Sequence, residues 1–386
     1  MSATIHWLGA GLSSIPGIEK LTKDGRNIIV WNRSLAKAQN ALSNVKEQLT
    51  INALDWDSLT AAVQAGDILV SMLPATMHIQ VAQLCLDKNA HFVSSSYISP
   101  EMKALNKQAK QASLCFVNEV GLDPGLDHIL AHALVENYRS SEQYNSNNEL
   151  YFRSYCGGFP KIANDFKYKF SWSPLGVLKA LKSPAKWLAQ GEVKTSNAPW
   201  EALGDYTVQL ANGQETFQCY PNRDSLPFIE QYQLADAGNV KEFVRGTLRL
   251  AGWSDAWASL FDKVAKLTAS NDTAAAEQEL KTISEQLEKQ YSYDEGEPDR
   301  VVLHVELEAK QADNTVWKQA YLLDSAGNDK GQAMARLVSI PVSFAIESIL
   351  NKQAVTGVSA APHQSEHIAL WLNNLAELGE VITLTQ

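Results

Sequence analysis

The sequence predicts an α/β fold: a doubly wound parallel sheet joined to an inserted α+β substrate domain, which has a mixed or antiparallel sheet and a small helical block. Three observations support this prediction. Up to Val117, short apolar segments alternate with helical patterns, which is the strand–helix order of parallel α/β units. A glycine-rich turn directly follows the first apolar segment. Beyond Gly125, longer segments alternate polar and apolar residues, as expected of a sheet with one buried face.

Composition limits the classes of protein and partner. The 386 residues are enough for two or three domains, and 45% of them are hydrophobic, which is typical of a globular protein with a sizeable core. The formal net charge of −10 argues against nucleic acid or an anionic membrane as the main partner. No basic segment with an apolar stretch precedes the first strand, and no run of about 18 apolar residues occurs, so we expect a cytoplasmic protein.

The cysteines predict no metal site. They are widely separated and form no Cys-x-x-Cys pair, and two of them lie in apolar segments. We therefore expect reduced thiols in the core rather than zinc ligands. The four are Cys85, Cys115, Cys156 and Cys219.

The first strand, Thr4–Leu8, ends in Gly9-Ala10-Gly11-Leu12-Ser13-Ser14. This is the dinucleotide-binding fingerprint of Rossmann-type domains, with Ser14 in the place of the third glycine. Gly9 permits a tight turn, and Gly11 allows the backbone to approach a pyrophosphate at the start of the next helix. The sequence therefore predicts a Rossmann-type domain that binds a dinucleotide.

The residues after the second strand, Ile28–Trp31, indicate which dinucleotide binds. An NAD-binding domain usually carries an acidic residue there, which binds the ribose 2′-hydroxyl. This chain has Asn32-Arg33-Ser34 instead, with no carboxylate and one cation. Arg33 can pair with a 2′-phosphate, and Ser34 can donate to it while capping the next helix; an ordinary solvated arginine is the alternative. The pattern favours NADP(H) over NAD.

Further strand–helix units complete this domain. Asp57 is the expected N-cap of the helix after the third strand, and Ser99 caps a helix that begins with Pro100. Tyr97 follows the carboxyl end of a strand, where it either contacts a ligand or packs between the domains; position alone does not decide. The remaining strands are predicted at Ile51–Leu54, Ile68–Met72, His91–Ser94 and Leu114–Val117.

The segment Asn118–His128 is expected to join the two parts of the protein. Gly121 and Gly125 allow positive φ or close approach of the backbone, and Pro124 fixes its own φ. Asp127 is the expected cap of the next helix. An ordinary strand-to-helix turn would have a similar composition, but ligands bind outside the carboxyl ends of parallel strands. We therefore expect this segment to contact substrate or cofactor.

The second part is predicted to combine strands with a helical block. Val240–Gly252 is predicted as a helix, which places Arg245 and Arg249 on one face. Gln332–Leu350 is predicted as a helix with a kink or break at Pro341. Other strands are predicted at Glu149–Cys156, Tyr168–Ser173, Thr207–Leu210, Thr216–Tyr220, Val301–Ala309 and Val316–Leu323, and other helices at Ala256–Leu267, Ala274–Gln290 and Glu366–Leu378.

Domain boundaries follow from these patterns. Residues 1–124 and 332–386 are assigned to the Rossmann-type NADP-binding domain. Residues 125–331 are assigned to the substrate domain, with a helical subdomain at about 239–291.

Four arginines in an otherwise acidic chain bear on the substrate. If they converge on one cleft, they suit a substrate with several carboxylates, because each guanidinium can bind a carboxylate bidentately. If they are spread over the surface they carry no such meaning, and the residues alone favour that reading. The four are Arg153, Arg223, Arg245 and Arg249.

Five motifs resemble those of the saccharopine reductase family, the NADP-dependent, L-glutamate-forming saccharopine dehydrogenases. They keep their order and end before Leu250, whereas the last third of the chain is only loosely similar. The resemblance implies interconversion of saccharopine with L-glutamate and 2-aminoadipate 6-semialdehyde, by hydride transfer between NADP(H) and an imine, in lysine metabolism. The motifs are Asn118–His128, Ser154–Pro160, Tyr168–Ser173, Tyr220–Ser225 and Arg245–Arg249.

By the same resemblance, the glycine-rich turn holds the pyrophosphate, the loop after the second strand holds the adenosine phosphate, and the loops after later strands face the nicotinamide or the substrate. Asn32 and Ser34 depart from the family pattern, which leaves the strength of the NADP preference open. The implied cofactor-binding residues are Gly9, Ala10, Gly11, Leu12, Ser13, Asn32, Arg33, Ser34, Asp55, Trp56, Ser71, Ser95, Ser96, Leu122, Asp123 and Pro124. The implied substrate-binding residues are Ser96, Tyr97, Asp123, Arg223, Thr247, Leu248 and Arg249.

The implied reaction suits these residue types. Saccharopine carries three carboxylates, so Arg223 and Arg249 can fix its ends while its secondary amine meets nicotinamide C4. Proton transfer is needed mainly for dehydration to the imine or for its hydrolysis. Asp123 and Tyr97, with Cys156 third, are the candidate catalytic groups, although the substrate's own amine or carboxylate, or water, can serve instead.

Two alternatives stay open. A related imine-reducing enzyme, such as a carboxynorspermidine dehydrogenase, would handle a polyamine and should place acidic groups where this chain has arginines. A non-catalytic NADP(H) sensor would report cofactor state to a partner, although Tyr97, Asp123 and the two implied substrate arginines argue against it. We expect a small-molecule substrate, no nucleic acid or membrane partner, and a homodimer, while the direction of the reaction is not determined.

Overall fold

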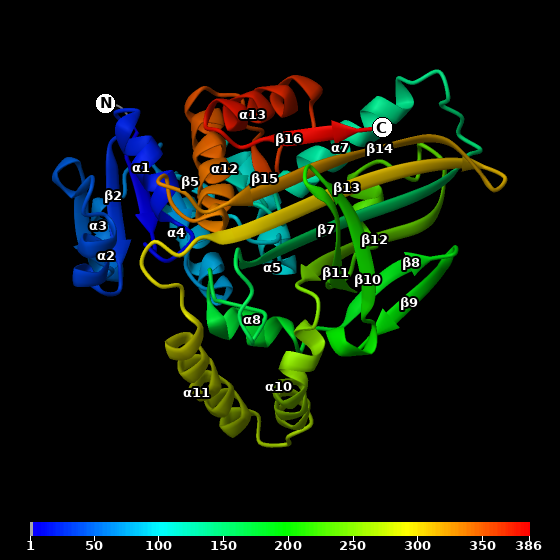
Figure 1. The fold of residues 1–386 in the computed structure, drawn as a ribbon. Helices are drawn as coiled ribbons and strands as arrows, with labels where there is room; N and C mark the ends of the chain where they lie inside the picture. Colours follow the sequence, from blue (N-terminus) through cyan, green and yellow to red (C-terminus); the bar gives the residue numbers. More distant parts are fainter. Residues whose placement is uncertain (1–2) are drawn as a thin grey trace. The chain divides into compact units, whose positions relative to one another are not determined.

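The computed structural model describes residues 3–386, which form two compact units (Figure 1). Unit 1 comprises the described residues up to Ile129 together with Asp329–Pro362. Unit 2 comprises Leu130–Asn328 and His363–Gln386. The chain therefore leaves unit 1, builds most of unit 2, returns to unit 1, and ends in unit 2. The helix α7 (Leu126–Arg139) begins in the first unit and ends in the second.

Unit 1 is built on a seven-stranded sheet whose described pairings are parallel. The strand order is β15-β6-β5-β4-β1-β2-β3, so the direction of winding reverses between β1 and β4. This doubly wound order confirms the predicted Rossmann-type fold, in which ligands bind outside the carboxyl ends of the strands. The strands are β1 (Ile5–Leu8), β2 (Ile28–Asn32), β3 (Thr50–Ala53), β4 (Ile68–Ser71), β5 (His91–Val93), β6 (Cys115–Val117) and β15 (Gly357–Ser359).

Helices connect these strands, and α12 is the core helix of unit 1. It packs against α1, where a Cβ at Gly17 would lie 2.4 Å from the Ser339 carbonyl oxygen, so only glycine permits the approach. It is long and apolar enough to cross a membrane, but 72% of this apolar segment is buried inside the protein. The helix continues through Pro341, so the predicted break does not occur. The helices are α1 (Ile15–Lys23), α2 (Leu35–Ala41), α3 (Trp56–Ala62), α4 (His78–Lys88), α5 (Pro100–Ala104), α6 (Asn106–Gln111) and α12 (Ala333–Leu350).

Unit 2 is built on a nine-stranded mixed sheet, as predicted. The main path is β10-β11-β12-β7-β13-β14-β16, and the β8–β9 hairpin pairs with β12 beside it. β12 and β7 pair in parallel, whereas their other neighbours pair antiparallel. The strands are β7 (Glu149–Pro160), β8 (Ala185–Ala189), β9 (Glu192–Ser196), β10 (Gly204–Leu210), β11 (Gly213–Pro221), β12 (Asn239–Arg249), β13 (Asp299–Gln311), β14 (Asn314–Ala326) and β16 (Ile382–Thr385).

A helical block accompanies this sheet. It contains α8 (Pro174–Ala180) and the long hairpin of α10 (Trp253–Thr268) and α11 (Thr273–Tyr291), which Figure 1 shows projecting from the strands of unit 2. The hairpin confirms the two helices predicted there. Its core is aromatic and includes Tyr168 and Trp257. Unit 2 also contains α9 (Pro227–Gln231) and α13 (Ser365–Glu377).

Two predicted elements were wrong. Val240–Gly252 is not a helix: most of it forms β12, which hydrogen-bonds to β7 on one side and to β11 on the other. Its apolar pattern suits both periods, and the neighbouring strands decide between them. Tyr168–Ser173 is not a strand, because Tyr168 and Phe170 pack into the core of the helical block instead.

The domain boundaries differ from the predicted ones at two places. Residues 363–386 belong to unit 2 rather than to the Rossmann-type unit, because β16 pairs with β14. The helical subdomain predicted at about 239–291 begins only at Trp253, with the hairpin of α10 and α11, because the residues before it form β12. All four cysteines are buried free thiols, as predicted.

Candidate active site

The glycine-rich turn after β1 is tightly packed at Gly9 and exposed at Gly11 and Leu12. Gly9 has a φ of +97°, and a Cβ there would lie 2.8 Å from the Met72 carbonyl oxygen, so only glycine fits. The Ser14 hydroxyl, in the third-glycine position, donates to the Gly9 carbonyl oxygen at 2.9 Å. A Cβ at Gly11 would meet nothing within 4 Å, and Leu12 is 58% exposed. The turn thus fits a pyrophosphate at the N-terminus of α1.

The end of β2 presents one exposed cation. Asn32 Oδ1 accepts from the backbone N–H of Ala10 at 3.1 Å, and its amide donates to the Ser34 carbonyl oxygen at 2.9 Å. This side chain therefore ties the loop after β2 to the glycine-rich turn. Ser34 caps α2 as predicted, by accepting from the N–H of Lys37. Arg33 is exposed, and within residues 3–386 no hydrogen bond or ion pair holds its guanidinium. A free cation here fits the 2′-phosphate of NADP.

Asp55, not Asp57, is the N-cap of α3, so the predicted cap was wrong by two positions. Asp55 Oδ2 accepts from the hydroxyl of Ser58 at 2.6 Å and from its backbone N–H at 2.8 Å. These bonds, the hydroxyl foremost, lower the pKa of Asp55. Asp57 lies in the first turn of the helix, and Trp56 packs against the core of unit 1. In the sequence Asp-Trp-Asp, composition alone does not determine which acid caps.

A histidine that the sequence analysis missed links two of the predicted site residues. The Ser71 hydroxyl at the end of β4 lies 2.8 Å from His78 Nδ1, and His78 Nε2 lies 2.8 Å from the Ser96 hydroxyl. Burial lowers the pKa of His78 to about 4. The predicted neighbour Ser95 lies beside Gly121, whose Cβ would come within 3.0 Å of Ser95 Cβ. His78 belongs to no motif, so only the fold reveals it.

Tyr97 and Asp123 meet at the carboxyl ends of β5 and β6. The Tyr97 hydroxyl donates to Asp123 Oδ1 at 3.0 Å. The Asp123–Pro124 peptide bond is cis, and the backbone N–H of Gly121 donates to the Pro124 carbonyl oxygen at 2.9 Å. A Cβ at Gly125 would lie 2.1 Å from the Gly121 carbonyl oxygen, so glycine is required for this loop to close on itself. Asp123 therefore lies in a tight loop that is closed on both sides of it.

Three buried ionisable residues that flank this loop in sequence are held by hydrogen bonds or ion pairs. His128 Nε2 lies 3.2 Å from Glu119 Oε2, and the other oxygen of Glu119 accepts from the N–H of Ile98 at 3.0 Å. Both side chains are buried. Asp127 lies in the first turn of α7 and accepts from the N–H of Gly125 at 2.7 Å. Asp127 is therefore not the cap that we predicted, because α7 already begins at Leu126.

Two predicted site residues of unit 2, Thr247 and Cys156, lie side by side on one face of the sheet. Thr247 of β12 is in register with Tyr220 of β11 and with Cys156 of β7. Residues in register on neighbouring strands share a face, so these three side chains form a row. Leu248 points to the opposite face, where it is fully buried beside Phe217. The side chain of Leu248 is therefore not on the face that carries Thr247.

Arg249 is a buried cation among aromatic rings. It is 7% exposed, and its guanidinium carbon lies 5.0 Å from the ring centre of Tyr168, 5.6 Å from that of Tyr220 and 5.3 Å from that of Trp253. Its Nη2 donates to the Tyr220 hydroxyl at 2.8 Å, whereas Nε has no partner. Within residues 3–386 no carboxylate pairs with this guanidinium. A buried cation is usually paired, so Arg249 is equipped to receive an anionic ligand.

Arg223 and Arg245 flank the same row. Arg223 has a φ of +53° in the turn after β11, and its carbonyl oxygen accepts from the N–H of Lys186 at 2.8 Å. Arg245 is buried, with its guanidinium carbon 4.0 Å from the ring centre of Phe228. Arg249 is in register with Gln218 of β11, whereas Arg223 lies two residues beyond the end of that strand at Pro221. The two arginines therefore lie at different positions along β11.

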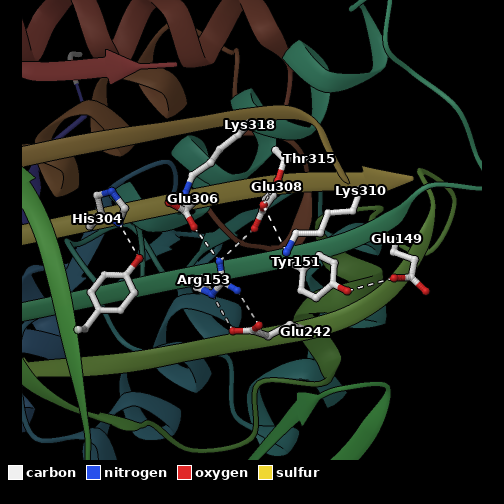
Figure 2. A network of polar contacts seen from close by, with 11 residues as sticks. Glu149, Tyr151, Arg153, Glu242, His304, Glu306, Glu308, Lys310, Thr315 and Lys318 are labelled. Atoms are coloured by element: carbon white, nitrogen blue, oxygen red, sulfur yellow. Dashed lines mark hydrogen bonds and ion pairs between the residues drawn. The ribbon is translucent and has the colours of Figure 1, made fainter. Parts of the chain in front are cut away.

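Arg153 does not belong to this group. It lies on the other face of the sheet, where it donates to Glu242 at 2.7 Å and to Glu306 at 2.8 Å (Figure 2). Lys318 pairs with the second oxygen of Glu306 at 2.9 Å. Figure 2 shows Glu308 on the same network, which is satisfied from within unit 2. The idea that all four arginines converge is therefore wrong for Arg153, whose charge is already neutralised.

Comparison with known proteins agrees with this geometry. The model of the saccharopine dehydrogenase NADP binding domain matches residues 5–117, and that of the saccharopine dehydrogenase C-terminal domain matches residues 121–380. A saccharopine dehydrogenase [NADP(+), L-glutamate-forming] from Pyricularia oryzae is 29% identical over 90% of this chain and 91% of its own length. One from Schizosaccharomyces pombe is 27% identical over 97% of both chains.

Longer and solved relatives extend the comparison. The mitochondrial alpha-aminoadipic semialdehyde synthase of Rattus norvegicus is 35% identical over 64% of this chain, which spans only 27% of that protein. The apo structure of saccharopine dehydrogenase (L-Glu forming) from Saccharomyces cerevisiae covers 100% of the chain with a TM-score of 0.79 and 25% identity. A homospermidine synthase from Legionella pneumophila shares the fold alone, at a TM-score of 0.62 and 9% identity. The chain belongs to the saccharopine dehydrogenase family and carries that family's NADP-binding domain.

Proposed function

We propose that the protein is an NADP-dependent, L-glutamate-forming saccharopine dehydrogenase. It would interconvert saccharopine with L-glutamate and 2-aminoadipate 6-semialdehyde in lysine metabolism. The observation that carries the proposal is Arg249: a buried guanidinium with aromatic neighbours and an unused Nε–H, set in a motif of this family. Desolvated guanidinium groups bind carboxylates strongly, and saccharopine offers three.

The residues of unit 1 fit NADP, which supplies a hydride acceptor at the nicotinamide when bound. The open tip of the glycine-rich turn at Gly11 would receive the pyrophosphate. Arg33 would pair with the 2′-phosphate, since its guanidinium is exposed and the loop after β2 contains no acid. Ser71, Ser95 and Ser96 follow the ends of β4 and β5, which is where loops of this fold meet the nicotinamide half.

The residues of unit 2 fit a substrate with charged ends. Arg223 and Arg249 would hold carboxylates at the two ends of saccharopine, with Thr247 and Cys156 in the row beside Arg249. This would fix the secondary amine and limit its motion, because hydride transfer needs alignment more than it needs a strong acid. Arginines rather than acids on this face disfavour a carboxynorspermidine substrate, which carries a polyamine chain.

The candidates for proton transfer are Asp123 with Tyr97, then Cys156, and otherwise the substrate's own amine or carboxylate, or water. Asp123 accepts from the Tyr97 hydroxyl, so the two act as a unit. Water must add to the imine carbon, and the secondary amine must be protonated when glutamate leaves. A carboxylate within hydrogen-bond reach of that amine can hold or move this proton.

We further propose a cytoplasmic homodimer that acts on small molecules without a nucleic acid or membrane partner. The net charge of −10 supports the absence of polyanionic partners, and four free thiols support a reducing compartment. Light scattering on the purified protein should give twice the 42.5 kDa of one chain. A single-chain mass at micromolar concentration would contradict the dimer.

The activity is tested by adding saccharopine to the protein and NADP and following the near-ultraviolet absorbance of the NADPH that forms. The proposal expects a steady increase that depends on both compounds. Carboxynorspermidine in place of saccharopine should give none. Tight NADPH binding without turnover of either compound would favour the sensor instead.

A further inference from the structure

His78 stands between two hydroxyl groups in the interior of unit 1. Ser71 at the end of β4 is fully buried, and its Oγ lies 2.8 Å from Nδ1 of the imidazole. Nε2 lies 2.8 Å from Oγ of Ser96, which is half-buried in the loop after β5. The ring meets the edge of Phe92 at 6.4 Å between centres, so packing as well as hydrogen bonds fixes its plane. A continuous chain of hydrogen bonds therefore leads from the strand to a residue of the predicted site.

The direction of this chain follows from what each group can donate. Burial keeps the pKa of His78 near 4, so the imidazole is neutral, and one nitrogen donates while the other accepts. Within residues 3–386 the Ser71 hydroxyl has no other partner. If it accepted from Nδ1, its own proton would be buried without an acceptor, which is unfavourable. Ser71 therefore donates to Nδ1, and the ring proton sits on Nε2.

This arrangement leaves the Ser96 hydroxyl able to donate a hydrogen bond. Because Nε2–H donates to Ser96 Oγ, the hydroxyl proton of Ser96 is left to point away from the imidazole. The backbone of Ser96 is anchored as well: its N–H donates to Ser94 Oγ at 3.2 Å, and its carbonyl oxygen accepts from the N–H of Glu119 at 3.1 Å. The hydroxyl is thus held as a donor in the loop that also carries Tyr97.

We propose that His78 is a positioning residue, which orients the Ser96 hydroxyl to donate to an oxygen of the bound ligands. This inference rests on the proposed function. The oxygen belongs either to a substrate carboxylate or to the nicotinamide carboxamide, since both present the same acceptor chemistry. His78 itself would touch neither ligand and would act only through Ser96.

The kinetic test compares two amides at position 78. In His78→Gln the amide nitrogen reaches the place of Nε2 and can still donate to Ser96, whereas in His78→Asn the shorter side chain reaches only the place of Nδ1. His78→Gln should keep kcat/KM within about threefold of the unchanged protein, and His78→Asn should lose about tenfold, as expected for one hydrogen bond. Thermal unfolding of both variants is measured to confirm that they fold.

A double-mutant cycle with Ser96→Ala shows whether His78 acts through Ser96. In that background, His78→Asn should cost less than about twofold, because its route to the ligand is already gone. A raised KM for saccharopine with an unchanged NADPH Kd would place the accepting oxygen on the substrate, and a weakened NADPH Kd would place it on the carboxamide. Multiplicative losses in the cycle, or an equal loss in His78→Gln and His78→Asn, would overturn the proposal.

Nitrogen-15 NMR of histidine-labelled protein provides a test that needs no turnover. The signal that disappears in His78→Gln should belong to a neutral imidazole protonated at Nε2 at pH 7, and Ser71→Ala should weaken that preference. An imidazolium, or a ring protonated at Nδ1, would overturn the proposal even if saccharopine is oxidised. The predicted tautomer in a protein that does not oxidise saccharopine would instead reject the proposed function alone.

Discussion

The Tyr97 hydroxyl donates to Asp123 Oδ1 at 3.0 Å, across 26 residues of sequence. The fold brings the two together because Tyr97 follows β5 and Asp123 follows β6, and these strands are parallel neighbours. The loop around Asp123 is closed by the hydrogen bond from the Gly121 N–H to the Pro124 carbonyl oxygen. A carboxylate held in this way is suited to orient a substrate amine, and we expect positioning rather than proton shuttling to be its main role.

Replacing Asp123 by asparagine tests that role. The amide oxygen can still accept from Tyr97, so the loss of turnover should stay below the 100-fold or more that removal of an acid–base group typically costs. Both limbs of the pH–rate profile should remain. If one limb vanishes while saccharopine and NADPH still bind, Asp123 is the acid–base group and our expectation is wrong.

Replacing Arg33 by alanine tests the cofactor assignment. The affinity for NADPH should fall by about 1–3 kcal/mol, because the 2′-phosphate loses a charge-assisted hydrogen bond. The affinity for NADH should hardly change, since NADH has no such phosphate. Fluorescence titration of both cofactors measures the difference. Equal losses for the two would remove Arg33 from the 2′-phosphate site.

Replacing Arg249 or Arg223 by alanine tests the substrate side. Each change should cost roughly 2–4 kcal/mol in kcat/KM for saccharopine, because a desolvated carboxylate loses its partner. The Kd for NADPH should stay the same. Arg300→Gln is a matched control, since that arginine is paired with Glu215 and Asp324. A normal KM for saccharopine in either variant would place that arginine outside the substrate site.

Replacing Glu306 by glutamine tests the ionic network of Figure 2 through the pH dependence of stability. Burial alone would raise the pKa of Glu306, but the hydrogen bond and charge of Lys318 and the charge of Arg153 outweigh it, so the pKa is lowered. A carboxylate with a lowered folded-state pKa stabilises the protein above its unfolded-state pKa, and this contribution is lost as the pH falls through the folded-state value.

Denaturant unfolding measures this effect. At pH 7 the free energy of unfolding should be about 1–3 kcal/mol lower for Glu306→Gln than for the unchanged protein. The difference should shrink once the pH falls below the ordinary carboxylate value of 4.5. Glu192→Gln, at an exposed pair with Lys194, should leave stability nearly unchanged at every pH. A difference that does not depend on pH would reject the ionic explanation.

The sequence predicted the parallel sheet well because its signals are local. Most strands of unit 1 are short apolar segments with a helix pattern behind them, and Gly9 and Ser34 act within their own turns as expected, whereas β15 was not predicted. The hydrogen bond between Tyr97 and Asp123 was not predicted, although it follows from the pairing of β5 with β6. Residues placed by such local rules were predicted without the structure.

Other features depend on partners that are distant in sequence. Val240–Gly252 suits a helix or a strand, and only pairing with β7 and β11 decides. β16 has mostly exposed residues and no pattern of its own, so its place beside β14 could not be predicted. The sequence could not separate Arg153 from the predicted substrate arginines, because only the sheet register shows that it lies on the other face, among glutamates. His78 could be recognised as a site residue only from its contacts with the hydroxyl groups of Ser71 and Ser96.

The central claim is the reaction itself, and its products test that claim most directly. The secondary amine of saccharopine can lose hydride from either flanking carbon: one choice releases L-glutamate and 2-aminoadipate 6-semialdehyde, and the other releases lysine and 2-oxoglutarate. Protein, saccharopine and NADP should be incubated together, and L-glutamate and NADPH should be quantified. We predict equal amounts of both. Lysine with 2-oxoglutarate, or no NADPH at all, would contradict the account.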